Sequence, residues 1–196
     1  MKHLLITGFD PFGGQSVNPS WEAVRRLPDE VGHWRLTKLQ IPTVFGQAAE
    51  TVLAAADEIH PDAIVCVGQA GGRSAITPEV VAINLREAQI ADNAGSRPVN
   101  EPVAEDGPCG YFSTLPVRQM VQAMTAAGYP AALSYSAGAF VCNDVLYTLL
   151  HSYTQTATAV GFLHVPFLPE QAGETHPSLP LADIVAALTC AIAAME

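Results

Sequence analysis

The sequence predicts a single-domain, three-layer α/β/α sandwich around a mostly parallel twisted sheet, spanning residues 1–196. Short apolar runs typical of buried strands alternate with helical segments along the whole chain, and this alternation predicts a parallel sheet covered by helices. With 196 residues, the chain is long enough to bury about 70% of its unfolded surface. No tract of biased composition divides it into two domains.

The N-terminal half predicts strands and helices with recognisable ends. Apolar runs or alternation indicate strands, and apolar residues recurring every three to four positions indicate helices. Asn18 can cap the first helix, Pro19 suits its first turn, and His60-Pro61 ends the second helix. The expected elements are a strand at 4–7, a helix opening at 18–22, a strand at 35–41, a helix over 45–59 and a strand at 63–67.

The C-terminal half continues the alternation. Gly128 marks a helix end, since glycine readily adopts the left-handed conformation that often follows a helix. An apolar run leads directly into a helix-like stretch at Cys142, which predicts a strand-to-helix junction there. The expected elements are a strand at 80–85, a helix over 116–127, the run 131–141 followed by a helix at 143–150, a strand at 157–162 and a closing helix over 180–195.

A long irregular stretch occupies residues 89–114. Loops of this length within a compact domain are usually functional or disordered. Tyr111, Phe112 and several turn residues favour an ordered lid or a subunit contact over a flexible linker.

Composition limits the partners. The 19 acidic residues outnumber the 9 basic ones, and the net charge is −10. Such a chain repels nucleic acid and anionic membrane surfaces, so we expect neither as a partner. No apolar run approaches the roughly 18 residues of a spanning helix, and the N-terminal run is too short for a signal peptide. We therefore expect a cytoplasmic protein.

Cysteine usage points to reduced thiols. The four cysteines lie far apart and form no CxxC pair, so neither a disulfide framework nor a zinc site is expected. Cys66 and Cys190 lie within apolar segments and are interpreted as core residues, whereas Cys109 lies in the long irregular stretch.

Cys142 is the candidate nucleophile. The free backbone N–H groups of a helix's first turn favour a thiolate over a thiol. His164 follows an apolar strand and offers the imidazole that such a cysteine needs, and Glu79 offers a carboxylate to orient the imidazole. The three residue types together are those of nucleophilic catalysis.

Three loops at the expected carboxyl end of the sheet carry candidate binding residues, because open α/β sheets bind ligands at that edge. In residues 8–14, Phe9 and Phe12 can present two rings to a small planar group. In residues 68–73, glycines permit close approach of a ligand and Gln69 supplies hydrogen bonds. The third loop is 136–142.

Each candidate also has a purely structural interpretation, which the residues alone leave open. Buried thiols and hydrogen-bonded core histidines are common, and loop carboxylates are usually solvated. Under this interpretation Cys142 and His164 are core residues, Glu79 is a surface carboxylate, Phe9 and Phe12 are core aromatics, and Asn18 is only a helix cap.

Taken together, four blocks resemble the pyroglutamyl peptidase I family (pyrrolidone-carboxylate peptidases), cysteine peptidases that remove an N-terminal pyroglutamyl residue from peptides. The resemblance extends over essentially the whole chain. The blocks are Thr7-Gly-Phe-Asp-Pro-Phe-Gly-Gly14 with Asn18-Pro19, Gly68-Gln-Ala-Gly-Gly-Arg73 running to Ile76-Thr-Pro-Glu79 and Val81-Ala-Ile-Asn84, Ser136-Ala-Gly-Ala-Phe-Val-Cys-Asn143, and Gly161-Phe-Leu-His-Val-Pro-Phe167.

The resemblance implies a role for each matching residue. Cys142 becomes the nucleophile, His164 the general acid/base and Glu79 the third member of a triad that forms a thioester acyl-enzyme. The substrates implied are pyroglutamyl-terminated peptides, with no metal or organic cofactor, and the assembly implied is a dimer or tetramer. The residues implied around the pyroglutamyl ring are Phe9, Phe12, Asn18, Gln69 and Val141.

The chain departs from the family pattern at one position. The segment Glu87-Ala-Gln-Ile-Ala-Asp-Asn93 carries Gln89 where the family commonly has an arginine near the active site. An amide still donates a hydrogen bond but supplies no charge, and the loss of one oxyanion donor costs about 10²–10³ in rate. We expect Gln89 at the substrate site and a reduced turnover.

Two other classes of function remain open on the residues. A nucleoside phosphorylase-like enzyme would use the 68–73 loop to hold phosphate, and it would stay active with Cys142→Ser. A catalytically idle binding protein would keep the Phe9 and Phe12 pocket without a reactive thiol, and Gln89 is the feature that favours it. A P-loop is excluded because no Gly-Lys-Ser/Thr follows a glycine loop.

Overall fold

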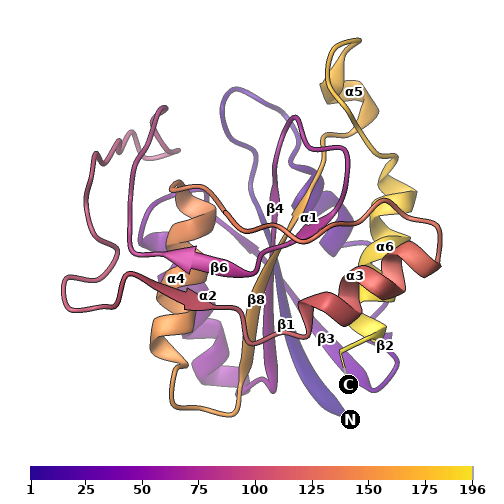
Figure 1. The fold of residues 1–196 in the computed structure, drawn as a ribbon, viewed down its shortest axis with the longest axis horizontal. Helices are drawn as coiled ribbons and strands as arrows, with labels where there is room; N and C mark the ends of the chain where they lie inside the picture. The colour runs from indigo at the N-terminus through magenta and orange to yellow at the C-terminus, as the bar shows by residue number, and fades with distance from the viewer. Residues whose placement is uncertain (196) are drawn as a thin grey trace.

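The computed structural model describes residues 1–195 and shows the expected α/β fold. Its main sheet has six strands in the order β2-β3-β1-β4-β8-β5, and a separate hairpin pairs β6 with β7 (Figure 1). The strands are β1 (Lys2–Phe9), β2 (Glu30–Val31), β3 (Trp34–Ile41), β4 (Ala63–Gln69), β5 (Thr77–Pro78), β6 (Val81–Ile83), β7 (Gly110–Phe112) and β8 (Ala159–Val165).

The centre of the sheet is parallel, as predicted. β1 lies between β3 and β4, and β4 pairs with β8, all in parallel, whereas β2 and β5 are antiparallel edge strands. β1 and β4 are almost wholly buried along their length. Strands covered on both faces consist of continuous apolar residues, which explains why the sequence predicted both β1 and β4.

Helices cover the two faces of the sheet and complete the sandwich. The first face carries α1, α3 and α6, and the second carries α2 and α4, as the two hydrophobic clusters show. The helices are α1 (Pro19–Val24), α2 (Gln47–Ile59), α3 (Val117–Ala126), α4 (Val141–Ser152), α5 (Pro169–Ala172) and α6 (Leu181–Ala193). The expected cap is present, since the Asn18 side chain accepts a hydrogen bond from the Ser20 N–H.

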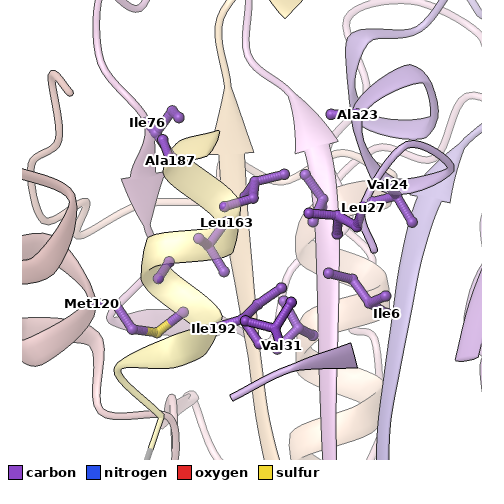
Figure 2. Packing of buried hydrophobic residues seen from close by; sticks show 14 of the residues in the cluster. Ile6, Ala23, Val24, Leu27, Val31, Ile76, Met120, Leu163, Ala187 and Ile192 are labelled. Atoms are coloured by element: carbon purple, nitrogen blue, oxygen red, sulfur yellow. The ribbon is translucent and has the colours of Figure 1, made fainter. Parts of the chain in front are cut away.

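The first face holds the larger of the two cores. Figure 2 shows Met120 of α3 and Ile192 of α6 gathered with Ile6 and Leu163 of the sheet. All four side chains are fully or almost fully buried. This packing fixes the positions of β1 and β8, whose ends carry candidate site residues.

The segment 131–141 is not a strand, and this corrects the prediction of a strand-to-helix junction before Cys142. It makes only isolated bridges, Ile76 to Ala131 and Glu79 to Ser134. Two serine side chains draw its backbone into local turns, because Ser136 N bonds Ser134 Oγ and Gly138 N bonds Ser136 Oγ. Val141, the last residue of this segment, opens α4, so Cys142 keeps the expected helix N-terminus.

The strand expected at 80–85 also differs from the prediction. Only β6 forms there, and it pairs with β7 outside the main sheet. The main sheet instead gains the two-residue β5, which is too short to give a periodic signal.

The long irregular stretch is ordered by hydrogen bonds. Arg86 and Glu101 form a backbone bridge across it. Asp92 holds three backbone N–H groups, those of Phe45, Ala94 and Ser96, so the loop is tied both to itself and to the segment before α2. Backbone bonds of this kind support the expected ordered loop.

The loops that follow β1, β4 and β8 lie at one edge of the sheet, opposite both chain termini (Figure 1). Parallel strands bring their carboxyl ends to the same edge. Residues 8–14, residues 68–73 and His164 therefore meet there.

Candidate active site

Cys142 lies in the first turn of α4, which spans Val141–Ser152. The cap position belongs to Phe140, whose apolar side chain cannot accept hydrogen bonds from the first backbone N–H groups. Those N–H groups, together with the positive end of the helix dipole, are thus available to a negative charge near Cys142.

Gly68 makes room for the thiol next to the strand that carries the imidazole. In the register of β4 and β8, Gly68 lies opposite His164. A Cβ atom added to Gly68 would lie 3.0 Å from Cys142 Sγ and 2.6 Å from the ring of Phe162. Only glycine leaves room for the sulfur at this point, and Cys142 and His164 line the same cavity.

Glu79 orients His164. The imidazole Nδ1–H donates to Glu79 Oε1 at 2.7 Å, and both side chains are buried. Burial alone would raise the pKa of Glu79, but the hydrogen bonds of His164, Ser134 and Arg73 outweigh it and the pKa is lowered. Burial lowers the pKa of His164, so the ring is a neutral base near pH 7 with Nε2 free.

In the substrate-free site, the protonated thiol of Cys142 is favoured over the thiolate expected from the helix N-terminus. Burial is the main cause and raises its pKa to about 12, and the Glu79 and Cys66 charges act in the same direction. The Arg73 charge and the backbone N–H of Cys142 act in the opposite direction but do not offset burial. The resting pair is therefore a neutral thiol and a neutral imidazole.

A cavity of about 470 Å³ opens beside the thiol and the imidazole. Its wall is mainly apolar, with a few polar groups at defined points, which suits a small, uncharged ligand. The residues that line it are Phe9, Phe12, Asn18, Thr43, Gln69, Ala70, Arg73, Ser136, Ala137, Gly138, Phe140, Cys142 and His164.

The two predicted aromatic residues both line this cavity. Phe9 is almost fully buried and packs against Phe162, with ring centroids 6.2 Å apart. Phe12 packs against Phe140 at 6.3 Å. Each ring is thus both a packed side chain and part of the cavity wall, and its contact with a substrate stays a prediction.

Asn18 and Gln69 present polar groups to the cavity. Asn18 caps α1 through Oδ1, and its Nδ2 donates to the carbonyl of Asp10, which orders the loop after β1. Gln69 Oε1 accepts a hydrogen bond from Gln171 Nε2 at 3.1 Å. The amide of Gln69 is thereby oriented with its oxygen toward Gln171.

Val141 and Gln89 do not belong to the cavity wall formed by residues 1–195. Val141 is fully buried at the start of α4, behind the residues that line the cavity. Gln89 is exposed on the long loop. Contact of either residue with a substrate stays a prediction.

Several site residues were missed because no local pattern marks them. Thr43 lies in the turn after β3, and its N–H and hydroxyl both donate to Asp10 Oδ1. Arg73 closes the glycine-rich loop, and Gln171 comes from the short helix α5. The motif around Arg73 was visible in the sequence, but its contacts depend on residues distant in the chain.

Comparison with known proteins agrees with this geometry. A family model described as "Pyroglutamyl peptidase" matches residues 2–196. A pyrrolidone-carboxylate peptidase of Levilactobacillus brevis is 50% identical over 196 residues, covering 98% of this chain and 96% of the relative. One of Enterococcus faecalis is 51% identical over 170 residues, covering 86% of this chain and 80% of the relative.

The chain belongs to the pyroglutamyl peptidase family. The structure of Bacillus amyloliquefaciens pyroglutamyl peptidase I superimposes with a TM-score of 0.96 at 46% identity, covering all of this chain and 97% of that one. The pyrrolidone carboxyl peptidase of Thermococcus litoralis gives 0.94 at 33% identity, covering 100% and 93%.

The expected family, fold class and enzyme class are therefore confirmed: this pyroglutamyl peptidase is a cysteine-type hydrolase. Within residues 1–195, no helix is long and apolar enough to cross a membrane. Its cysteines are all free, with Cys66 buried in β4 as predicted and Cys109 exposed in the long loop.

Proposed function

We propose that this peptidase hydrolyses the amide bond that follows an N-terminal pyroglutamyl residue, through a Cys142, His164 and Glu79 triad and a thioester intermediate. The observation that supports this most is the arrangement of the site: the thiol and the imidazole line the same cavity, and the imidazole is bonded to a buried carboxylate. These are the nucleophile, base and orienting group of covalent acyl transfer.

The cavity suits a pyroglutamyl group. That group is a compact neutral lactam with one N–H donor and one carbonyl acceptor, and the wall offers the rings of Phe9 and Phe12 with few polar groups. Because Gln171 holds the oxygen of the Gln69 amide, the Gln69 Nε2–H₂ group is left to donate to the lactam carbonyl.

An uncyclised terminus should be rejected. Glutamate or glutamine at the N-terminus carries an ammonium group, and the cavity wall contains no carboxylate among residues 1–195 to pair with it. Burying an unpaired charge is costly, so discrimination follows from this penalty.

In the first step, Cys142 Sγ attacks the pyroglutamyl carbonyl carbon while its proton passes to His164 Nε2. Negative charge forms on the carbonyl oxygen, and the uncapped backbone N–H groups at the start of α4 stabilise it. Glu79 accepts the Nδ1–H bond and stabilises the imidazolium. Because the resting pair is neutral, proton transfer accompanies the attack.

In the second step, the C–N bond breaks and His164 delivers its proton to the departing amine nitrogen. The product of this half-reaction is a thioester on Cys142 and a free peptide. Water then adds to the thioester, with His164 Nε2 taking its proton, and the collapse releases pyroglutamate and restores the thiol.

The structure weakens the phosphorylase alternative. A phosphorylase would need a cation in the 68–73 loop to hold phosphate. The guanidinium of Arg73 already bonds Glu79, Thr77 and the carbonyl of Ser136. The charge of Arg73 is thus largely offset by a buried carboxylate.

The direct test uses chromophoric amides of pyroglutamate, proline and glutamine. We expect amine release from the pyroglutamyl amide alone, and acid quenching during turnover should yield protein heavier by one pyroglutamyl group, attached at Cys142. Release from all three amides, or turnover without any acylated protein in rapid-quench samples, would contradict the proposal.

The proposal includes assembly into a dimer or tetramer and a cytoplasmic location, for one catalytic domain over residues 1–196. Exposed apolar side chains at Ile90, Val99 and Phe112 on and beside the long loop support self-association. A reactive thiol among free cysteines supports a reducing compartment. Sedimentation analysis tests the assembly, and a monomer at micromolar concentration would contradict it.

A further inference from the structure

We infer that Arg73 is a positioning residue of this site: its guanidinium offsets the buried charge of Glu79, keeps His164 in the neutral form that the reaction needs, and anchors the loop before Cys142. This inference rests on the proposed triad. It concerns a residue that touches Glu79 rather than the reacting atoms.

Two donors converge on one oxygen of Glu79. Arg73 Nη1 and His164 Nδ1 each lie 2.7 Å from Oε1. The other oxygen, Oε2, is buried and accepts no hydrogen bond from residues 1–195. A fully buried carboxylate therefore depends on these two donors, and on the Ser134 side chain that also lowers its pKa, for its compensation.

The charge of the two donors differs in the resting site. His164 is neutral there, because burial lowers its pKa, whereas an arginine is always protonated. Arg73 thus supplies the positive charge that balances Glu79. Without it, the buried carboxylate would gain a counter-charge most easily by drawing a proton onto the adjacent imidazole, and a protonated imidazole cannot accept the proton of the thiol.

Among residues 1–195, Arg73 is the only arginine or lysine that forms an ion pair with Glu79. Arg73 lowers the pKa of His164 and also that of Cys142. Four titratable or charged groups act on the imidazole or the thiol. Cys66 lies in β4, Arg73 in the loop after β4, Glu79 directly after β5, and Cys142 in α4.

The other terminal nitrogen of the Arg73 guanidinium bonds the loop that precedes α4. Nη2 donates to the backbone carbonyl of Ser136 at 3.0 Å, and Ser136, Ala137 and Gly138 all line the cavity. One planar group thereby links the carboxylate of the triad to the loop that leads into α4. A lysine could keep the charge but could not form this fork.

The test measures the pKa of His164 by NMR on ¹³C-histidine-labelled protein, independently of activity. We expect Arg73→Gln to raise this pKa by about one unit or more, since the charge of Glu79 is then unopposed. Arg118→Gln, which removes the same charge from the exposed face of α3, is the matched control and should leave it unchanged.

Two further variants separate charge from shape. Arg73→Lys should keep the His164 pKa near the parent value but lower kcat about tenfold, because the Ser136 anchor is lost. Arg73→Gln/Glu79→Gln removes both charges, so the pKa should return close to the parent value. This double variant buries no unpaired charge, so the His164 pKa can still be measured in it if Arg73→Gln alone does not fold.

An unchanged His164 pKa in Arg73→Gln, or a raised pKa that persists in the double variant, would overturn the inference. The pH profile of kcat/KM gives a separate answer. If the NMR pKa rises but the acid limb of kcat/KM does not follow it, the role of His164 as the base fails while the role of Arg73 stands.

Discussion

The imidazole of His164 and the carboxylate of Glu79 form a hydrogen bond of 2.7 Å in the interior of the protein. The backbones of the two residues are also tied together, because the N–H of Glu79 donates to the carbonyl of Phe162 on β8, the strand that carries His164. With Nδ1 committed to Glu79, Nε2 is the remaining ring nitrogen of a side chain that lines the cavity together with Cys142.

Replacement of Glu79 by glutamine should lower kcat by about 10²–10⁴, because an amide can orient the ring but cannot stabilise an imidazolium. Steady-state kinetics on a pyroglutamyl amide measures the loss, with circular dichroism to confirm folding. Glu58→Gln, on the exposed face of α2, is the matched control and should behave like the parent. An unchanged kcat in Glu79→Gln would remove Glu79 from the triad.

The thiol of Cys142 should stay protonated in the free enzyme at neutral pH, because burial raises its pKa to about 12. The thiolate absorbs in the ultraviolet, so the difference between the parent and Cys142→Ser reports its ionisation. We expect no thiolate signal at pH 7, and kcat/KM should fall only below the ordinary histidine pKa, since that of His164 is lowered. A thiolate signal at pH 7 would instead show a resting ion pair.

Gly68→Ala should separate the thiol from the imidazole. The new Cβ would lie 2.6 Å from the Phe162 ring and 3.0 Å from Cys142 Sγ, so both must move. We expect a loss of about 1–3 kcal/mol in unfolding free energy and a fall in kcat of at least about tenfold. Gly161→Ala is the matched control: its Cβ meets Leu115 at 2.5 Å in the first core, so stability should fall while kcat is kept.

Gln171→Leu should weaken substrate binding more than turnover. The change releases the oxygen of Gln69, so the amide can rotate and no longer presents a fixed donor to the lactam. One lost hydrogen bond is worth about 0.5–1.5 kcal/mol, which corresponds to a rise in KM of about two- to twelvefold. Gln122→Leu on the exposed side of α3 controls for the substitution, and equal KM values in the two variants would contradict this role.

The fold was largely predictable because its centre is locally encoded. β1 and β4 are continuous apolar runs, and Asn18-Pro19 marks the start of α1 by its own chemistry. The wrong prediction at 131–141 has a physical reason as well. Apolar content suggested a strand, but Ser134 and Ser136 bond the local backbone and Gly138 adopts a φ of +79°, so no ladder forms.

The candidate site was predictable where a motif carries it and not where a distant contact does. Phe9, Gln69 and His164 lie at the carboxyl ends of β1, β4 and β8, which meet at one edge of the sheet, as the alternation of elements already implied. The link from Gln171 to Gln69 joins residues 102 positions apart. The pKa of Cys142 also required the structure, because burial of the sulfur outweighs the helix N-terminus that the sequence revealed.

The most direct test of this account compares Cys142→Ala with Cys109→Ala in release of a chromophoric amine from a pyroglutamyl amide, with and without reductant. Cys109 is the exposed cysteine of the long loop, so its variant controls for the loss of any thiol. We predict that the parent and Cys109→Ala require reductant and are active, and that Cys142→Ala is inactive but folded. Activity retained in Cys142→Ala would contradict the nucleophile on which the whole mechanism depends.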